Sequence, residues 1–178
     1  MNHENGQTIV EALIAISILT IGVFGMLNLL NQSLGLNTFV TSQYIGSNLA
    51  MEGVEVIKNI IDSNFLQGKP FNDGLNNGYY EIQYNSNSLG APKCSLSDDK
   101  NACFNSSNNL YKDNNGIYSY NTSNAIKTPF KRIVRIENLD QDGDGKVEQI
   151  KVNSIVQWTI KGGTYEINAE DHFFNWRQ

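Results

Sequence analysis

The chain has 178 residues, of which 40% are apolar, 10% aromatic and 17% charged, and its formal net charge is −5. This length predicts one domain or two small ones, and the apolar content excludes a disordered chain. The negative charge argues against a general nucleic-acid-binding protein, because phosphate backbones are bound by excess Lys and Arg. The charges are unevenly distributed, with no Asp, Glu, Lys or Arg between Glu11 and Glu52. The asymmetry predicts an apolar anchor followed by a water-soluble head.

The anchor is the apolar run from Ile9 to Leu30, which is 22 residues long. A helix of that length covers roughly 33 Å, enough for the ~30 Å hydrocarbon core of a bilayer. The run is longer than the ~7–15 apolar residues of a cleavable secretory signal, and no basic residue precedes it. We therefore expect a membrane-spanning helix at about residues 9–30.

Glu11 lies two residues inside this apolar run. A carboxylate at membrane depth costs a few kcal/mol, so such a residue is usually paired or functional. The alternative is that Glu11 lies at the headgroup boundary and stays hydrated.

The segment from Gly6 through Gln7 and Glu11 into the apolar run resembles the N-terminus of type IV prepilins and pseudopilins. The resemblance implies that residues 1–6 are a leader peptide, which a prepilin peptidase cleaves between Gly6 and Gln7. It also implies N-methylation of Gln7 and makes Glu11 the fifth residue of the mature chain, where the family has its acidic residue. Two features depart from the family pattern: Gln7 replaces the common Phe, and the leader has no Lys or Arg.

In that family the apolar helices of many subunits pack together in a filament. The resemblance implies that the amino terminus of one subunit pairs with Glu11 of another, and a buried charge pair of this kind sets register because an unpaired charge is costly. The chain is thus expected to be a minor pilin or pseudopilin of a type IV pilus-like or type II secretion-like filament. Its expected partners are prepilin peptidase and other pilins, first in the cytoplasmic membrane and then in an extracellular filament. The alternative is a membrane-anchored calcium-binding or adhesive module that never polymerises.

The helix is expected to continue beyond the membrane, over residues 7–63, with its end between Ser63 and Gln67. Apolar residues recur there at spacings of three and four, which makes one stripe that needs a partner surface. The stripe consists of Leu49, Gly53, Val56, Ile57, Ile60 and Ile61. Both this stretch and the last 50 residues resemble PilV-like minor pilins.

The head, residues 64–178, is expected to be an antiparallel β-meander packed on the helix stripe, which makes the fold α+β and pilin-like. Alternating residues over Ile150–Ile160 predict a strand with one buried and one wet face. Gly162-Gly163 predicts a hairpin turn, and the aromatic residues Phe173, Phe174 and Trp176 are expected to close the core. Other strands are expected at Tyr79–Tyr84, Ile117–Tyr120, Phe130–Ile136 and Thr164–Ala169, and the rest of 85–128 is expected to form long loops.

Between two predicted strands, Asp140, Asp142 and Asp144 alternate and Gly145 follows, as in the first half of an EF-hand calcium loop. The twelfth loop position is Lys151 instead of Glu, so the segment is not an EF-hand. It is interpreted as a β-hairpin that binds Ca²⁺, with Glu148 and the Lys146 carbonyl as further ligands. The alternative is a solvated turn, which Asp and Gly also favour.

Cys94 and Cys103 are the only cysteines. In an exported head an even number of cysteines favours a disulfide, here closing a short loop, over two free thiols. The sequence contains no nucleophile elbow, phosphate-binding loop or HExxH motif, so no enzymatic activity is expected.

Overall fold

The computed structural model describes residues 4–176, and the side chains of the first helix from Thr8 onward. The first three residues of the predicted leader lie outside this range. The chain divides into two compact units, Met1–Ser42 and Gln43–Gln178. Helix α1 (Glu4–Leu66) contributes residues to both units, and each unit is described separately below.

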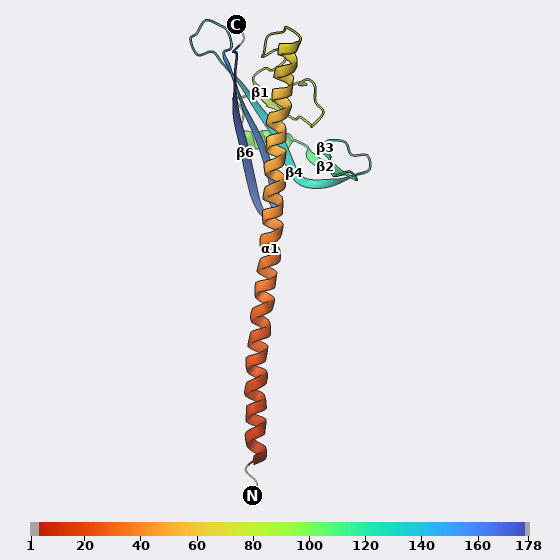
Figure 1. Ribbon diagram of the computed structural model, residues 1–178, viewed down its shortest axis with the longest axis vertical. Coiled ribbons are helices and arrows are strands. Elements are labelled where there is room, and N and C mark those ends of the chain that lie inside the picture. The colour runs from red at the N-terminus through yellow and green to blue at the C-terminus, as the bar shows by residue number, and fades with distance from the viewer. Residues whose placement is uncertain (1–3, 177–178) are drawn as a thin grey trace. The chain divides into compact units, whose positions relative to one another are not determined.

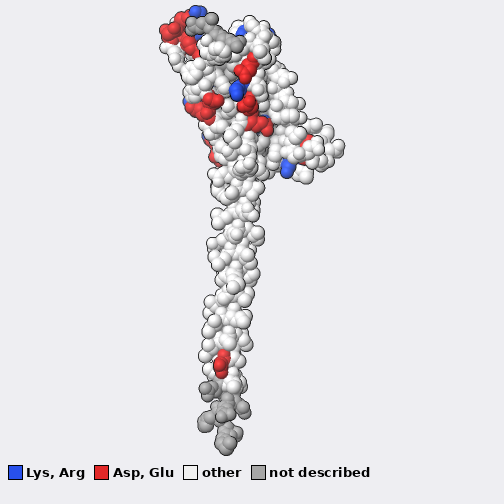
Figure 2. Space-filling model, viewed as in Figure 1, with Lys and Arg blue, Asp and Glu red and all other residues white. Residues whose placement is uncertain are grey.

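The first unit is the N-terminal part of α1. Its apolar side chains are largely exposed; Ile9, Leu13 and Phe24 are examples, each more than 60% accessible. This helix is long and apolar enough to cross a membrane. Figure 2 shows it as an almost uncharged surface with one acidic spot.

The second unit is an α+β fold, as expected, in which residues 43–66 of α1 pack on a six-stranded antiparallel sheet (Figure 1). The strands run in the order β3-β2-β4-β5-β6, and β1 also pairs with β4, so β6 is an edge strand. The elements that follow α1 are β1 (Gly78–Tyr80), α2 (Lys100–Ser106), β2 (Asn109–Asp113), β3 (Tyr118–Ser119), β4 (Ala125–Leu139), β5 (Gln149–Ile160) and β6 (Gly163–Phe174).

The predicted stripe of α1 is confirmed, because all six of its residues are buried. Val56, Ile57, Ile60 and Ile61 share one apolar cluster with residues of β4 and β5, including Val134 and Val152. Two glycines let the helix lie close to β5. A Cβ added at Gly53 would lie 3.0 Å from the Ser154 Cβ, and one at Gly46 would lie 2.8 Å from the Trp158 ring.

The opposite face of the sheet is also covered, which the sequence did not reveal. Helix α2 places Cys103 and Phe104 against Ile133 and Ile155 in a separate apolar cluster. One face of β5 was predicted to be wet. This prediction is wrong for the middle of the strand, where Asn153 and Ile155 are both buried. Helix α2 and strand β2 both lie in the segment that was expected to be mostly loop.

Three further expectations are corrected. Strand β1 ends at Tyr80 instead of Tyr84. The β5–β6 turn consists of Lys161 and Gly162, which both have positive φ (49° and 81°), as the two central residues of a type I′ turn require. Phe174 and Trp176 are 57% and 70% exposed and do not close the core, whereas the partly buried Phe173 packs against it.

Candidate functional site

The predicted processing site lies at the start of α1. The backbone of Gly6 and Gln7 is helical there, and the Glu11 carboxylate is exposed on the apolar part of the helix. From Thr8 to Ser42, Glu11 is the only acidic or basic residue. A lone carboxylate on an apolar helix requires either water or a positively charged partner once lipid or other helices surround it.

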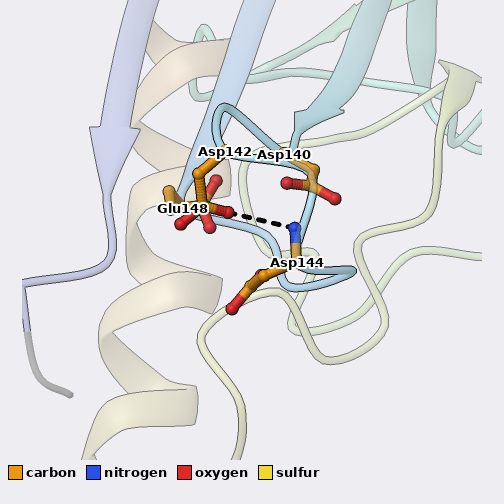
Figure 3. A group of neighbouring side chains, drawn as sticks. All are labelled: Asp140, Asp142, Asp144 and Glu148. Atoms are coloured by element: carbon orange, nitrogen blue, oxygen red, sulfur yellow. Dashed lines mark hydrogen bonds between the residues drawn. The ribbon is translucent and has the colours of Figure 1, made fainter.

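The acidic loop joins β4 to β5 (Figure 3), and its predicted metal ligands come together. One carboxylate oxygen from each of Asp140, Asp142, Asp144 and Glu148 lies within 4.8 Å of the others. The Asp side chains are exposed and Glu148 is half-buried. Oxygen donors at this spacing suit a hard cation such as Ca²⁺, which takes six to eight oxygen ligands.

The loop is also held by its own backbone. The two oxygens of Asp140 accept hydrogen bonds from the amides of Gly143 (2.6 Å) and Gly145 (2.9 Å). Both glycines have positive φ (78° and 86°), which brings those amides to face Asp140. Asp142 accepts from the Asp144 amide at 3.1 Å. The backbone amides therefore position the carboxylates and offset part of their mutual repulsion.

The Lys146 side chain binds a neighbouring acid, and the role of the Lys146 carbonyl as a ligand stays a prediction. Its Nζ lies 3.0 Å from Oδ2 of Asp144, and its amide donates to Oδ1 at 2.8 Å. Both hydrogen bonds lower the pKa of Asp144, and the one from Nζ raises the pKa of Lys146. A cation in the loop would therefore compete with the Lys146 ammonium for the same carboxylate.

A chain of polar side chains connects the acidic loop with the surface of β6. Gln141 donates to Gln149 at 2.7 Å, Gln149 contacts Nδ1 of His172, and Nε2 of His172 lies 3.0 Å from Glu170. Hydrogen bonds from His172, Asn153 and Lys151, in that order of importance, lower the pKa of Glu170 to about 2. No local pattern in the sequence indicates this network.

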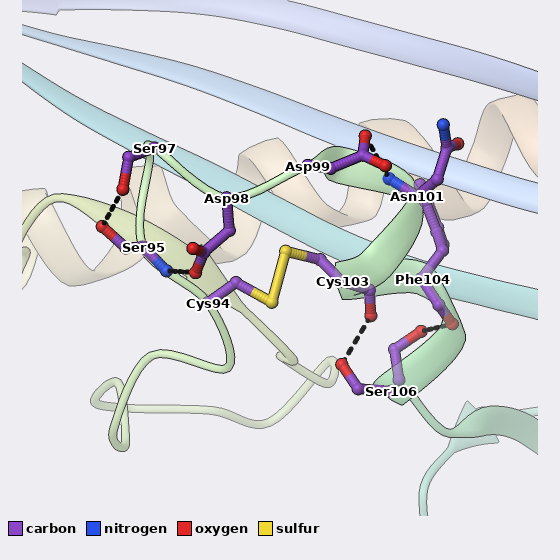
Figure 4. Close-up of a disulfide and its surroundings, with 10 residues drawn as sticks. Cys94, Ser95, Ser97, Asp98, Asp99, Asn101, Cys103, Phe104 and Ser106 are labelled. Carbon is purple, nitrogen blue, oxygen red and sulfur yellow. Dashed lines mark hydrogen bonds between the residues drawn. A yellow bond between two sulfur atoms is a disulfide. The ribbon is translucent and has the colours of Figure 1, made fainter.

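The disulfide between Cys94 and Cys103 is present, with Cα atoms 5.9 Å apart (Figure 4). Cys94 forms an isolated β-bridge with Tyr79 of β1, and Cys103 lies in α2 and is fully buried. Asp99 precedes α2 as its N-cap, and its side chain accepts a hydrogen bond from the Asn101 amide. The disulfide therefore ties α2 to the β1 edge of the sheet.

Arg132 is the functional-looking residue that sequence reasoning missed. It is fully buried in β4, and its guanidinium donates to the carbonyls of Leu49 (2.9 Å) and Ile82 (2.7 Å). It also pairs with Glu52 of α1 at 2.9 Å. The signal was available: Arg132 has the parity of Phe130, Val134 and Ile136, the residues of β4 that face α1. Its contacts join α1, β4 and the β1 segment, so its role is structural.

Tyr120 lies beside this arginine. Its hydroxyl donates to the carbonyl of Arg132 at 3.1 Å. Burial raises the pKa of Tyr120 well above its usual value. The phenol therefore stays neutral and keeps its proton for this hydrogen bond.

Compared with known proteins, the chain matches no family model, no curated protein and no solved structure.

Proposed function

We propose that the chain is a minor pilin or pseudopilin, a structural subunit that is processed by a prepilin peptidase and assembled through α1 into a type IV pilus-like or type II secretion-like filament. The observation that supports this best is the N-terminal part of α1, which is apolar on all sides and carries one carboxylate. Lipid would cover this surface before assembly, and the helices of other subunits would cover it afterwards.

The charge distribution supports the same function. A helix that is apolar around its whole circumference must be covered by lipid or protein. A permanent lipid anchor gains nothing from a carboxylate inside its apolar run, whereas a helix that joins a bundle can use one to fix its register. In the proposed filament, the Glu11 carboxylate forms an ion pair with the methylated, positively charged Gln7 amine of a neighbouring subunit.

Processing is tested by co-expressing the full chain with a prepilin peptidase and measuring the intact mass. We expect loss of residues 1–6 and the gain of one methyl group. A chain that keeps Met1 while a known prepilin in the same cells is cleaved would refute processing.

Assembly is tested separately with Glu11→Gln, which removes the charge and keeps the shape. We expect this variant to be cleaved normally but to be strongly depleted from sheared filaments of the native host. Glu55→Gln, at an exposed position of the same helix, is the matched control and should enter at the wild-type level. Equal incorporation of all three chains would refute the role of Glu11.

The acidic loop supports a second candidate, a calcium-binding membrane-anchored module that does not polymerise. Asp140, Asp142, Asp144 and Glu148 would supply the ligands, and the ion would stabilise the β4–β5 connection. In a chain that is membrane-anchored but uncleaved, this loop would be the main functional feature.

Calcium binding is tested by thermal unfolding of the full chain in detergent, with and without millimolar CaCl₂. We expect Ca²⁺ to raise the unfolding temperature, and the double variant Asp142→Ala with Asp144→Ala to abolish the rise. The double variant Asp98→Ala with Asp113→Ala changes two other head carboxylates and should keep the rise. An unchanged wild-type temperature would exclude the ion.

A further inference from the structure

The β2–β3 hairpin and the segment after β1 enclose a cleft that none of the functions above uses. Its volume is about 340 Å³, which is at the lower end of small-ligand sites. Most of the residues that line it are amides and hydroxyls. They come from the segment 83–85, from the hairpin residues 113–119, and from the connection 121–125 that leads into β4.

The cleft is rich in hydrogen-bonding groups without partners. The side-chain amides of Asn85, Asn114, Asn115 and Asn124 make no hydrogen bond to the part of the chain that the structure describes, and all four residues are exposed. Each amide offers two donors and an acceptor in one plane. A ligand with several adjacent hydroxyls, each both a donor and an acceptor, can satisfy such groups in pairs.

The backbone that presents these amides is fixed. Asp113 accepts hydrogen bonds from the amides of Asn115 (2.9 Å) and Ile117 (2.8 Å), and the Asp113 amide donates back to the Ile117 carbonyl. On the other wall, Asn121 accepts from the Ser123 amide at 2.9 Å. A site held in this way loses little conformational entropy when it binds a ligand.

Two apolar side chains complete the cleft. Tyr84 is 48% exposed and Ile117 is 38% exposed, and both belong to its lining. An aromatic ring beside polar groups suits a ligand with one C–H face and a polar rim. Pyranose rings have this combination.

The charge of the cleft disfavours anionic ligands. Among the residues that the structure describes, Asp113 is the only charged one in the lining, and no Lys or Arg contributes to it. Phosphate and sulfate groups bind through cations, so a nucleic acid or sulfated glycan would find no counter-charge here. Figure 2 agrees, because few charged side chains appear over the projecting part of the head that carries β2 and β3 in Figure 1.

We propose that this cleft binds a neutral saccharide, with the free amides of Asn85, Asn114, Asn115 and Asn124 contacting its hydroxyls and Tyr84 contacting one face of the ring. The site does not depend on filament assembly, and it would operate in either an assembled or an unassembled chain.

The test uses the full chain in a zwitterionic detergent without a sugar headgroup, applied to a printed array of neutral, sialylated and sulfated oligosaccharides. Array hits are then titrated in solution. We expect binding to neutral saccharides with dissociation constants between micromolar and millimolar. We expect Tyr84→Ala and Asn115→Ala each to weaken this binding at least tenfold.

Two matched controls keep the test specific. Tyr44→Ala and Asn59→Ala change the same residue types at exposed positions of α1 and should leave saccharide binding unchanged. The unfolding temperatures of all variants show that the head remains folded. The proposal is overturned by the absence of any neutral ligand, by a preference for sulfated or sialylated glycans, or by binding that survives both cleft substitutions.

Discussion

Replacing Gly53 by Ala should destabilise the second unit, although Ala favours a helix. The new Cβ would overlap the hydroxyl of Ser154 and lie 3.0 Å from its Cβ and 3.3 Å from Cγ2 of Val134. Ser154 is fully buried, and its strand is paired with Val134 on one side and Ala169 on the other. The strand therefore cannot move away without disturbing both neighbours.

The size of the effect follows from two opposing contributions. Ala stabilises a helix interior by about 0.8–1 kcal/mol relative to Gly. Inserting a methyl group into a closely packed interior costs about 1–3 kcal/mol. The contact is with the base of a fixed side chain, so the cost should lie in the upper part of that range. We expect a net loss of about 1–2 kcal/mol in the free energy of unfolding.

The assay is urea unfolding of the full chain in detergent, followed by the fluorescence of the buried Trp158. Gly90→Ala is the control, because nothing lies within 4 Å of its added Cβ. In a Ser154→Gly background most of the overlap disappears, and Gly53→Ala should then be neutral or stabilising. If Gly53→Ala is as stable as the wild type with Ser154 in place, the close packing of α1 on β5 is wrong.

Three other predictions concern charges and the disulfide. Glu52→Gln leaves the buried Arg132 without its carboxylate. Loss of a fully buried partner costs about 3–5 kcal/mol, but the Glu52 side chain is one-third exposed, so we expect a loss of about 1–2 kcal/mol in the free energy of unfolding by urea. No loss would contradict the pairing. The pKa of Glu170 falls on folding from 4.5 to about 2, so its stabilising contribution is full above pH 4.5 and is lost as the pH falls towards 2. The wild type should therefore lose more stability than Glu170→Gln between pH 6 and pH 3, and parallel pH profiles would refute the network. The double variant Cys94→Ser with Cys103→Ser opens a loop with a sequence separation of 9 and should lower the free energy of unfolding by about 2–3 kcal/mol in the same assay. An unchanged midpoint would show that α2 is held by its apolar contacts alone.

The parts of the fold that the sequence predicted well are those with a strict period. The apolar stripe of α1 repeats over several helical turns, and the alternation in β5 repeats over several pairs of residues. Each pattern therefore identifies a buried face even when the element that packs on that face is unknown. Helix α2 has only seven residues, and its buried residues Cys103 and Phe104 are adjacent, which leaves no period to detect. Its position depends on apolar contacts with Ile133 and Ile155 of the sheet, which only the folded chain brings together.

The candidate sites divide in the same way. The acidic loop is local in sequence, so its carboxylates could be placed together from spacing alone. The cleft at β2–β3 joins segments from Gln83 to Ala125, and Arg132 pairs with a residue 80 positions away. Such arrangements depend on strand order and register, which alternation in single strands does not determine.

The last strand also shields its neighbour from other chains. Strand β6 pairs with β5 along its whole length, from Ile160–Gly163 to Gln149–Phe174. A chain in which β6 is cut away would leave β5 as an open, apolar sheet edge, on which other chains can add and aggregate. Loss of β6 by proteolysis should therefore lead to aggregation of the head.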